Sequence, residues 1–185
     1  MKNNKIIFGF TGLMASGKGT AAKYFETKYG ASTYRFSTML RDLLDRLHLE
    51  KNRDNLIKLS EMLRAGFGED IMAKTIANDA KNDSNELVII EGIRRPADIS
   101  YLSKLPNFIL VEIYADVETR YNRLILRREN EDDATKTFEQ FIKDHDRSTE
   151  ITIPEVAALA QEKIDNNGTD QGLYQKLDAL LKKYR

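Results

Sequence analysis

Residues 12–20 read Gly12-Leu13-Met14-Ala15-Ser16-Gly17-Lys18-Gly19-Thr20. They follow a short apolar run, IIFGF at residues 6–10, and precede a helix-like stretch that ends near Gly30. A buried strand, a glycine-rich turn and a helix in this order are typical of a phosphate-binding loop, in which backbone N–H groups and the helix N-terminus attract anions. Gly12 and Gly17 supply the backbone freedom that such a turn requires. We therefore expect this segment to hold the phosphates of ATP.

The side chains of this segment predict separate roles. Lys18 is expected to bridge the β- and γ-phosphates, and Thr20 to lie beside the α- and β-phosphates. The strict pattern places Ser or Thr directly after the lysine to bind Mg²⁺, but this chain has Gly19 there. Mg²⁺ is still expected, because it bridges phosphate oxygens in phosphoryl transfer. The alternative is a glycine turn with an exposed lysine, and the order of strand, loop and helix argues against it. The expected ATP-binding residues of the loop are Gly12, Ala15, Ser16, Gly17, Lys18, Gly19 and Thr20.

Strand-like and helix-like segments alternate along the rest of the chain. Strands are predicted at residues 5–11, 32–36, 86–91, 107–114 and 161–165. Helices are predicted at residues 19–29, 38–49, 53–65, 69–80, 97–104, 116–128 and 138–146, with a last helix capped by Thr169. Nearly continuous apolar strands between helices predict an α/β fold, with a parallel sheet covered on both faces. Ligands then bind at the carboxyl ends of the strands.

Composition limits the class of protein. The 185 residues suit one domain, which we expect to span residues 1–185. Lys plus Arg equals Asp plus Glu at 29 each, so we expect no nucleic-acid or membrane partner. The chain has no cysteine and only two histidines, which excludes disulfides, thiol catalysis and zinc–thiolate sites. No apolar run matches a signal peptide or a membrane span, so the expected location is the cytoplasm, as a monomer or homodimer.

Arginines follow the second and third predicted strands. Ser37-Thr38-Met39-Leu40-Arg41 follows the second, and Glu91-Gly92-Ile93-Arg94-Arg95-Pro96 follows the third. The carboxyl ends of parallel strands share one edge of a sheet, and a guanidinium binds phosphate through two N–H groups. These arginines are therefore candidates for an anion site. The alternative for Arg41 is a surface position on an amphipathic helix, and Arg64 is a further candidate that is equally consistent with an exposed helix position.

Three more arginines, Arg120, Arg123 and Arg127, recur at i, i+3 and i+7 after the fourth strand, which places them on one face of a helix. One interpretation is a solvated basic face. The other is a lid that closes over the transferring phosphoryl group, because phosphoryl transfer needs positioning and charge neutralisation. On this interpretation the catalytic residues are Lys18, Arg94, Arg123 and Arg127.

The loop form Gly-Lys-Gly-Thr resembles that of adenylate kinase and other nucleoside monophosphate kinases. The segments after the second and third strands resemble their Ser-Thr-Gly-x-Leu-Leu-Arg and Asp-Gly-Phe-Pro-Arg motifs. This resemblance implies a three-layer P-loop fold with strand order 2-3-1-4-5, an acceptor-binding region at about residues 37–82 and a lid at about 128–150. It implies acceptor contacts from Ser37, Arg41 and Arg94, with Arg94 favoured over Arg95, and a Mg²⁺ role for Glu91 through water, with Thr20 as a second metal candidate. It also implies lid arginines at Arg128 and Arg147.

The segment at residues 163–169, KIDNNGT, resembles the C-terminal part of dephospho-CoA kinases, which implies that Asn167 and Gly168 lie near the adenine of ATP. A hydroxyl acceptor of that kind needs a general base, whereas a phosphate acceptor does not. We therefore expect a kinase that moves the γ-phosphoryl group of ATP to a nucleoside or deoxynucleoside monophosphate. A dephospho-CoA kinase and a non-catalytic P-loop regulator are the alternatives.

Overall fold

A five-stranded parallel sheet forms the centre of the protein in the computed structural model, which describes residues 5–127, 133–148 and 150–185. The strand order is β2-β3-β1-β4-β5, as the resemblance implied. The strands are β1 (Ile6–Thr11), β2 (Ser32–Arg35), β3 (Leu87–Ile93), β4 (Phe108–Tyr114) and β5 (Glu162–Asp165). All six residues of β1 are buried, because this strand lies between β3 and β4 at the middle of the sheet.

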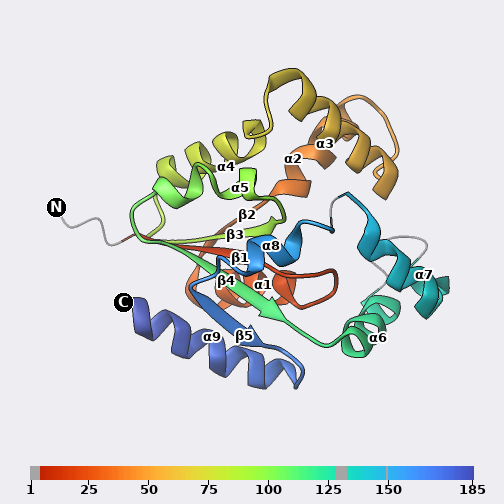
Figure 1. Ribbon diagram of the computed structural model, residues 1–185. Helices are drawn as coiled ribbons and strands as arrows, with labels where there is room; N and C mark the ends of the chain where they lie inside the picture. The colour runs from red at the N-terminus through yellow and green to blue at the C-terminus, as the bar shows by residue number, and fades with distance from the viewer. Residues whose placement is uncertain (1–4, 128–132, 149) are drawn as a thin grey trace.

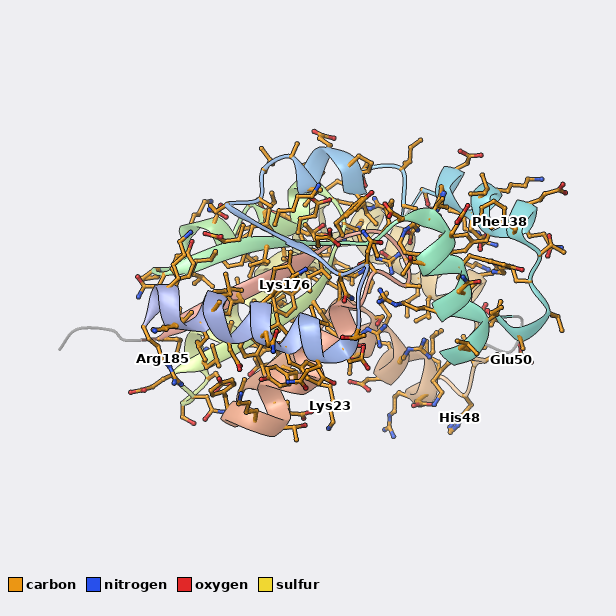
Figure 2. All side chains as sticks on the ribbon, turned by 90° about the horizontal axis from the view of Figure 1, so that it is seen from below. Lys23, His48, Glu50, Phe138, Lys176 and Arg185 are labelled. Atoms are coloured by element: carbon orange, nitrogen blue, oxygen red, sulfur yellow. The ribbon has the colours of Figure 1, made fainter. Side chains whose placement is uncertain are left out.

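Helices cover both faces of the sheet (Figure 1). They are α1 (Lys18–Tyr29), α2 (Phe36–Arg46), α3 (Arg53–Phe67), α4 (Ile71–Asn82), α5 (Pro96–Ile99), α6 (Val117–Arg127), α7 (Phe138–Lys143), α8 (Ile153–Ala157) and α9 (Asp170–Tyr184). In Figure 1, α9 lies below the sheet and α4 and α5 lie above it. Residues of α1 share one core with α9, and residues of α8 share the other core with α4. Figure 2 shows the lower layer, with Lys176 on α9 and Lys23 on α1.

The two faces of the sheet have separate cores because successive side chains of a strand point to opposite sides. Phe8 and Phe10 pack toward α1, with ring centroids 5.8 Å and 6.2 Å from that of Phe25. Ile7 belongs to the other core, with Ile76 of α4. This double burial fixes β1, and with it the start of the loop that follows.

The structure differs from the predicted elements at several places, including α3, α5 and α8. The helix predicted at 53–65 continues through Gly66 to Phe67 and ends at Gly68, whose φ is +103°. The helix predicted at 97–104 is the four-residue α5 followed by a 3₁₀ turn at Leu102–Lys104. The five-residue α8 was not predicted, since so short a helix shows no apolar period. In the described ranges, no helix combines the length and apolar character needed to cross a membrane.

Candidate functional site

The phosphate loop lies between β1 and α1, where two glycines satisfy different steric demands. Gly12 has φ +141°, and a Cβ atom there would come within 2.2 Å of the carbonyl oxygen of Ile113. Gly17 has φ +107°, and a Cβ atom there would lie 2.2 Å from Nδ2 of Asn166. Asn166 in turn donates from Nδ2 to the carbonyl oxygen of Ser16 at 2.9 Å. A larger residue at position 12 or 17 would therefore displace the backbone of β4 or the turn that follows β5.

Lys18 lies across this loop. Its Nζ donates to the carbonyl oxygens of Gly12 at 2.6 Å and Leu13 at 2.9 Å. Thr20 is exposed on the first turn of α1, whereas Ser16 is buried and its Oγ has no hydrogen-bond partner among the described residues. Lys18 is thus an ammonium group held next to the loop whose amides form the expected phosphate site.

A cavity of about 720 Å³ opens from the phosphate loop toward α2, α3 and the carboxyl end of β3. Seven arginines and three carboxylates of the described chain line it, so anions are favoured inside. The arginines are Arg35, Arg41, Arg53, Arg64, Arg94, Arg95 and Arg123, and the carboxylates are Glu91, Asp98 and Asp170. Apolar side chains of α2, α3 and α4 complete the wall, namely Phe36, Leu40, Leu56, Ile57 and Met72.

Arg64 is buried, so the interpretation of an exposed helix residue was wrong. Its Nη2 donates to Oδ1 of Asp98 at 2.7 Å, and its Nε donates to Oγ of Ser60. Its Nη1 donates to the carbonyl oxygen of Glu69. Asp98 accepts through Oδ2 from the backbone N–H groups of Arg94 and the following residue at 3.0 Å each. The ion pair therefore ties α3 to the turn after β3.

Glu91 faces the start of α1. Its Oε1 lies 3.4 Å from Nε of Arg35, and its side chain is 12% exposed. A Cβ atom on Gly19 would lie 3.6 Å from Oε2 of Glu91. The carboxylate thus lies beside the position where other phosphate loops carry a metal-binding hydroxyl, so the donor set fits a Mg²⁺ ion held through phosphate oxygens and water.

Arg41 lines the cavity from α2 and has no hydrogen bond or ion pair to any residue that the structure describes. Ser37 also lines it, and its Oγ is buried without a hydrogen-bond partner among the same residues. Arg94 and Arg95 both line the cavity, and Arg95 lies 3.6 Å from Glu69. Both arginines of this turn thus reach the cavity, and the choice of Arg94 stays a prediction.

The arginines of α6 contact different parts of the site. Arg120 is 3% exposed and donates to the carbonyl oxygens of Met14 at 3.2 Å and Ala115 at 3.1 Å, so it braces the phosphate loop. Arg123 lines the cavity and donates to the carbonyl oxygens of Asn166 at 2.8 Å and Gly168 at 3.1 Å. The side chain of Arg127 and all of Arg128 lie outside the described part of the protein.

Three other predicted positions lie away from the cavity lining. Arg147 is bound to Asp144 at 2.7 Å and to Asp54 at 3.2 Å. In the turn after β5, Asn166 lines the cavity, whereas Asn167 and Gly168 are not among the described residues that do so. Oδ1 of Asn167 instead accepts from the backbone N–H of Asp116 at 2.7 Å.

Sequence reasoning missed several lining residues. Arg35 adjoins a predicted motif, so its place at a strand end was a usable signal. Arg53 begins α3 far from any motif, and Asp98 lies beyond the arginine turn, so nothing local identified either.

The sequence of the loop and its surroundings matches a known family. A family model described as AAA domain matches residues 11–141, which cover the phosphate loop and the segment up to α7. The UPF0200 protein of Sulfurisphaera tokodaii is 30% identical over 178 residues, covering 96% of each chain. The chain belongs to the AAA domain family and to the UPF0200 proteins. The UPF0200 protein of Pyrococcus abyssi is 28% identical over 183 residues and also covers 96% of each chain.

Solved structures share the fold of this AAA domain protein. TT1252 from Thermus thermophilus has a TM-score of 0.64 at 18% identity and covers 97% of each chain. Shikimate kinase from Acinetobacter baumannii, in complex with shikimate, has a TM-score of 0.56 at 16% identity and covers 98% of this chain and 95% of its own. At these identities the likeness concerns the fold, and it confirms the predicted three-layer P-loop fold.

Proposed function

We propose that this protein is an ATP-dependent phosphotransferase that moves the γ-phosphoryl group to a nucleoside or deoxynucleoside monophosphate. One observation carries the proposal: a single cavity joins the phosphate loop to a group of arginines on the acceptor side. The kinase-like fold supports a nucleotide-binding phosphotransferase. A non-catalytic nucleotide binder has no need for arginines at both ends of such a cavity.

The donor end consists of residues 12–20 together with Asn166. On binding ATP, Lys18 leaves the carbonyl oxygens that it contacts and bridges the β- and γ-phosphates. Mg²⁺, when bound, neutralises phosphate charge, with Glu91 orienting its water and Thr20 as a second candidate. The site then acts by positioning and charge neutralisation, because phosphoryl transfer needs little covalent chemistry from the protein.

The acceptor end belongs to residues 37–82 and to the turn after β3. Ser37, Arg41, Arg64 and Arg94 would contact the acceptor, and their guanidinium groups suit a phosphate. Arg123 and Arg127 would neutralise the transferring group from the other side. Residues 128–150, with Arg128 and Arg147, would form the lid that excludes water.

Two of the three carboxylates that line the cavity have partners that favour a phosphate acceptor over a hydroxyl acceptor. A hydroxyl acceptor needs a general base within hydrogen-bond reach. Asp98 accepts from Arg64 and from two backbone N–H groups, and Glu91 is paired with Arg35. Both carboxylates already have cationic or N–H partners, which leaves them fewer free lone pairs for the proton of a hydroxyl acceptor. Dephospho-CoA phosphorylation is therefore the second candidate.

A coupled assay of ADP release tests the proposal. AMP, CMP, GMP, UMP, their deoxy forms and dephospho-CoA are each supplied with Mg·ATP. Acceptor-dependent ADP release with a monophosphate supports the proposal, and release with dephospho-CoA alone replaces it with the second candidate. ATP hydrolysis that no acceptor stimulates would instead indicate a P-loop regulator.

A further inference from the structure

Glu150 is a buried carboxylate to which the proposed chemistry assigns no role. Its side chain is 1% exposed, and its Oε1 accepts from Nη1 of Arg94 at 2.5 Å. Oε1 also lies 3.6 Å from Nη2 of Arg53. Oε2 is buried and has no hydrogen-bond partner in the described ranges. A buried carboxylate with one oxygen unused costs desolvation free energy, so stability alone does not explain its presence.

The two arginines that contact Glu150 both line the cavity but come from different elements. Arg53 begins α3, and its Nη1 lies 3.2 Å from Sδ of Met14 in the phosphate loop. Arg94 follows β3, and its carbonyl oxygen accepts from Oγ1 of Thr152 at 2.7 Å. The segment at residues 150–152 therefore holds Arg94 by its side chain and by its backbone, and contacts the donor side through Arg53.

A second carboxylate nearby has a different set of partners. Asp144 accepts from Lys136 at 2.7 Å and from Arg147 at 2.7 Å, and it lies 3.3 Å from Arg53. Burial lowers the pKa of Arg53, and Glu150 and Asp144 oppose that shift. Asp144 thus secures the segment after α7, whereas both close cationic partners of Glu150 line the cavity.

We propose that Glu150 is a positioning residue that aims the guanidinium groups of Arg53 and Arg94 at the phosphoryl group in transit. The inference rests on the proposed phosphotransferase function. A guanidinium carries five N–H donors in one plane, so a carboxylate bound at one edge sets the direction of the others. Donors that are already oriented stabilise charge developing in the transition state without reorganising. Loss of Glu150 should therefore lower kcat and leave ATP binding intact.

The test compares Glu150→Gln with Glu155→Gln, which removes the same charge from an exposed position on α8. Arginine side-chain N–H resonances are recorded by ¹⁵N NMR and assigned with Arg53→Lys and Arg94→Lys. In the wild type, Arg94 should show separate, slowly rotating Nη groups, and these should average in Glu150→Gln. With the acceptor found in the screen, kcat should fall about tenfold to a hundredfold in Glu150→Gln, while the Kd of Mg·ATP is unchanged.

Unchanged Arg94 resonances in Glu150→Gln, or an equal fall of kcat in Glu155→Gln, would overturn the proposal. If Glu150→Gln does not fold, the wild-type spectrum decides, because rapidly averaging Nη groups of Arg94 contradict a fixed guanidinium. A wild type that phosphorylates none of the acceptors counts against the proposed function. In that case the arginine resonances still decide whether Glu150 fixes Arg94.

Discussion

Nη2 of Arg64 lies 2.7 Å from Oδ1 of Asp98, and the two side chains are only 4% and 3% exposed. Removing one partner of such a pair leaves the other charge buried and unpaired, which costs about 3–5 kcal/mol. We predict a loss of this size in the free energy of unfolding for Asp98→Asn, measured by urea denaturation. The exposed pair Lys23–Glu26 supplies the control, since Glu26→Gln should change stability by less than about 0.5 kcal/mol. Equal small losses in both variants would show that the buried pair is not structural.

Gly17→Ala should destabilise the protein and weaken ATP binding together. An alanine there would have to keep φ +107°, and its Cβ would lie 2.2 Å from Nδ2 of Asn166. Asn166 binds the phosphate loop through the carbonyl oxygen of Ser16. Gly30→Ala is a matched control, because Gly30 has φ +67° but no atom within 4 Å of its Cβ position. The control should cost about 1–2 kcal/mol from backbone strain alone, and Gly17→Ala should exceed it. Thermal denaturation and ATP titration measure both effects, and partial rescue by Asn166→Gly would identify the clash as the cause.

The fold was predictable because its determinants are local. The apolar run before Gly12 and the alternation of strands and helices after it were sufficient to predict the parallel sheet. The role of Gly17 was also predictable as a requirement for positive φ, although its contact with Asn166 was not. That contact joins residues far apart in the chain, and no sequence pattern encodes the approach.

The acceptor side was predictable only where an arginine adjoins a strand end. Arg41 and Arg94 occupy such places, and both line the cavity. The sequence did not distinguish a buried Arg64 from an exposed one, because its partner, Asp98, lies 34 positions later in the chain. Burial of a charged side chain depends on a partner supplied by the tertiary fold, so helix periodicity does not reveal it.

Protein stability should fall as the pH drops through about 6.5, because of His145. Burial lowers the pKa of His145 from its ordinary value of 6.5, and the Arg120 guanidinium, 3.0 Å from Nε2, adds to this shift. The carboxylates of Glu150, Asp144 and Asp146 oppose it. The unfolded chain therefore takes up a proton on His145 more readily than the folded chain does. The contribution of neutral His145 to the free energy of unfolding is thus complete above pH 6.5 and is lost as the pH falls below it.

Urea denaturation on either side of that pH measures the effect. The change in the free energy of unfolding across this pH should shrink in His145→Gln and persist in His48→Gln, because His48 is exposed. A pH dependence that is the same in wild type and His145→Gln would assign the effect to other groups.

Lys18→Ala should abolish most phosphoryl transfer and leave the fold intact. The Lys18 ammonium donates to the carbonyl oxygens of Gly12 and Leu13, and its side chain belongs to neither core of the sheet, so the packing of the sheet is unaffected. The rate should fall by about 10²–10³-fold, as for removal of a preorganised transition-state donor. Lys23→Ala, an exposed change on the same helix, should keep the wild-type rate. A folded Lys18→Ala protein with normal ADP release would refute the role.

Arg41→Ala should weaken binding of the acceptor and leave binding of ATP unchanged. Arg41 lines the cavity and has no partner within the described chain, so its removal leaves no buried charge unpaired and the fold should persist. Loss of a charge-assisted hydrogen bond to an acceptor phosphate should raise the acceptor KM by roughly tenfold to a hundredfold. The KM for ATP should not change, because the phosphate loop is untouched. Arg46→Ala, on the exposed end of α2, should leave both constants at their wild-type values. Equal increases in both KM values for Arg41→Ala would mean that this arginine acts on the cavity as a whole and does not bind the acceptor.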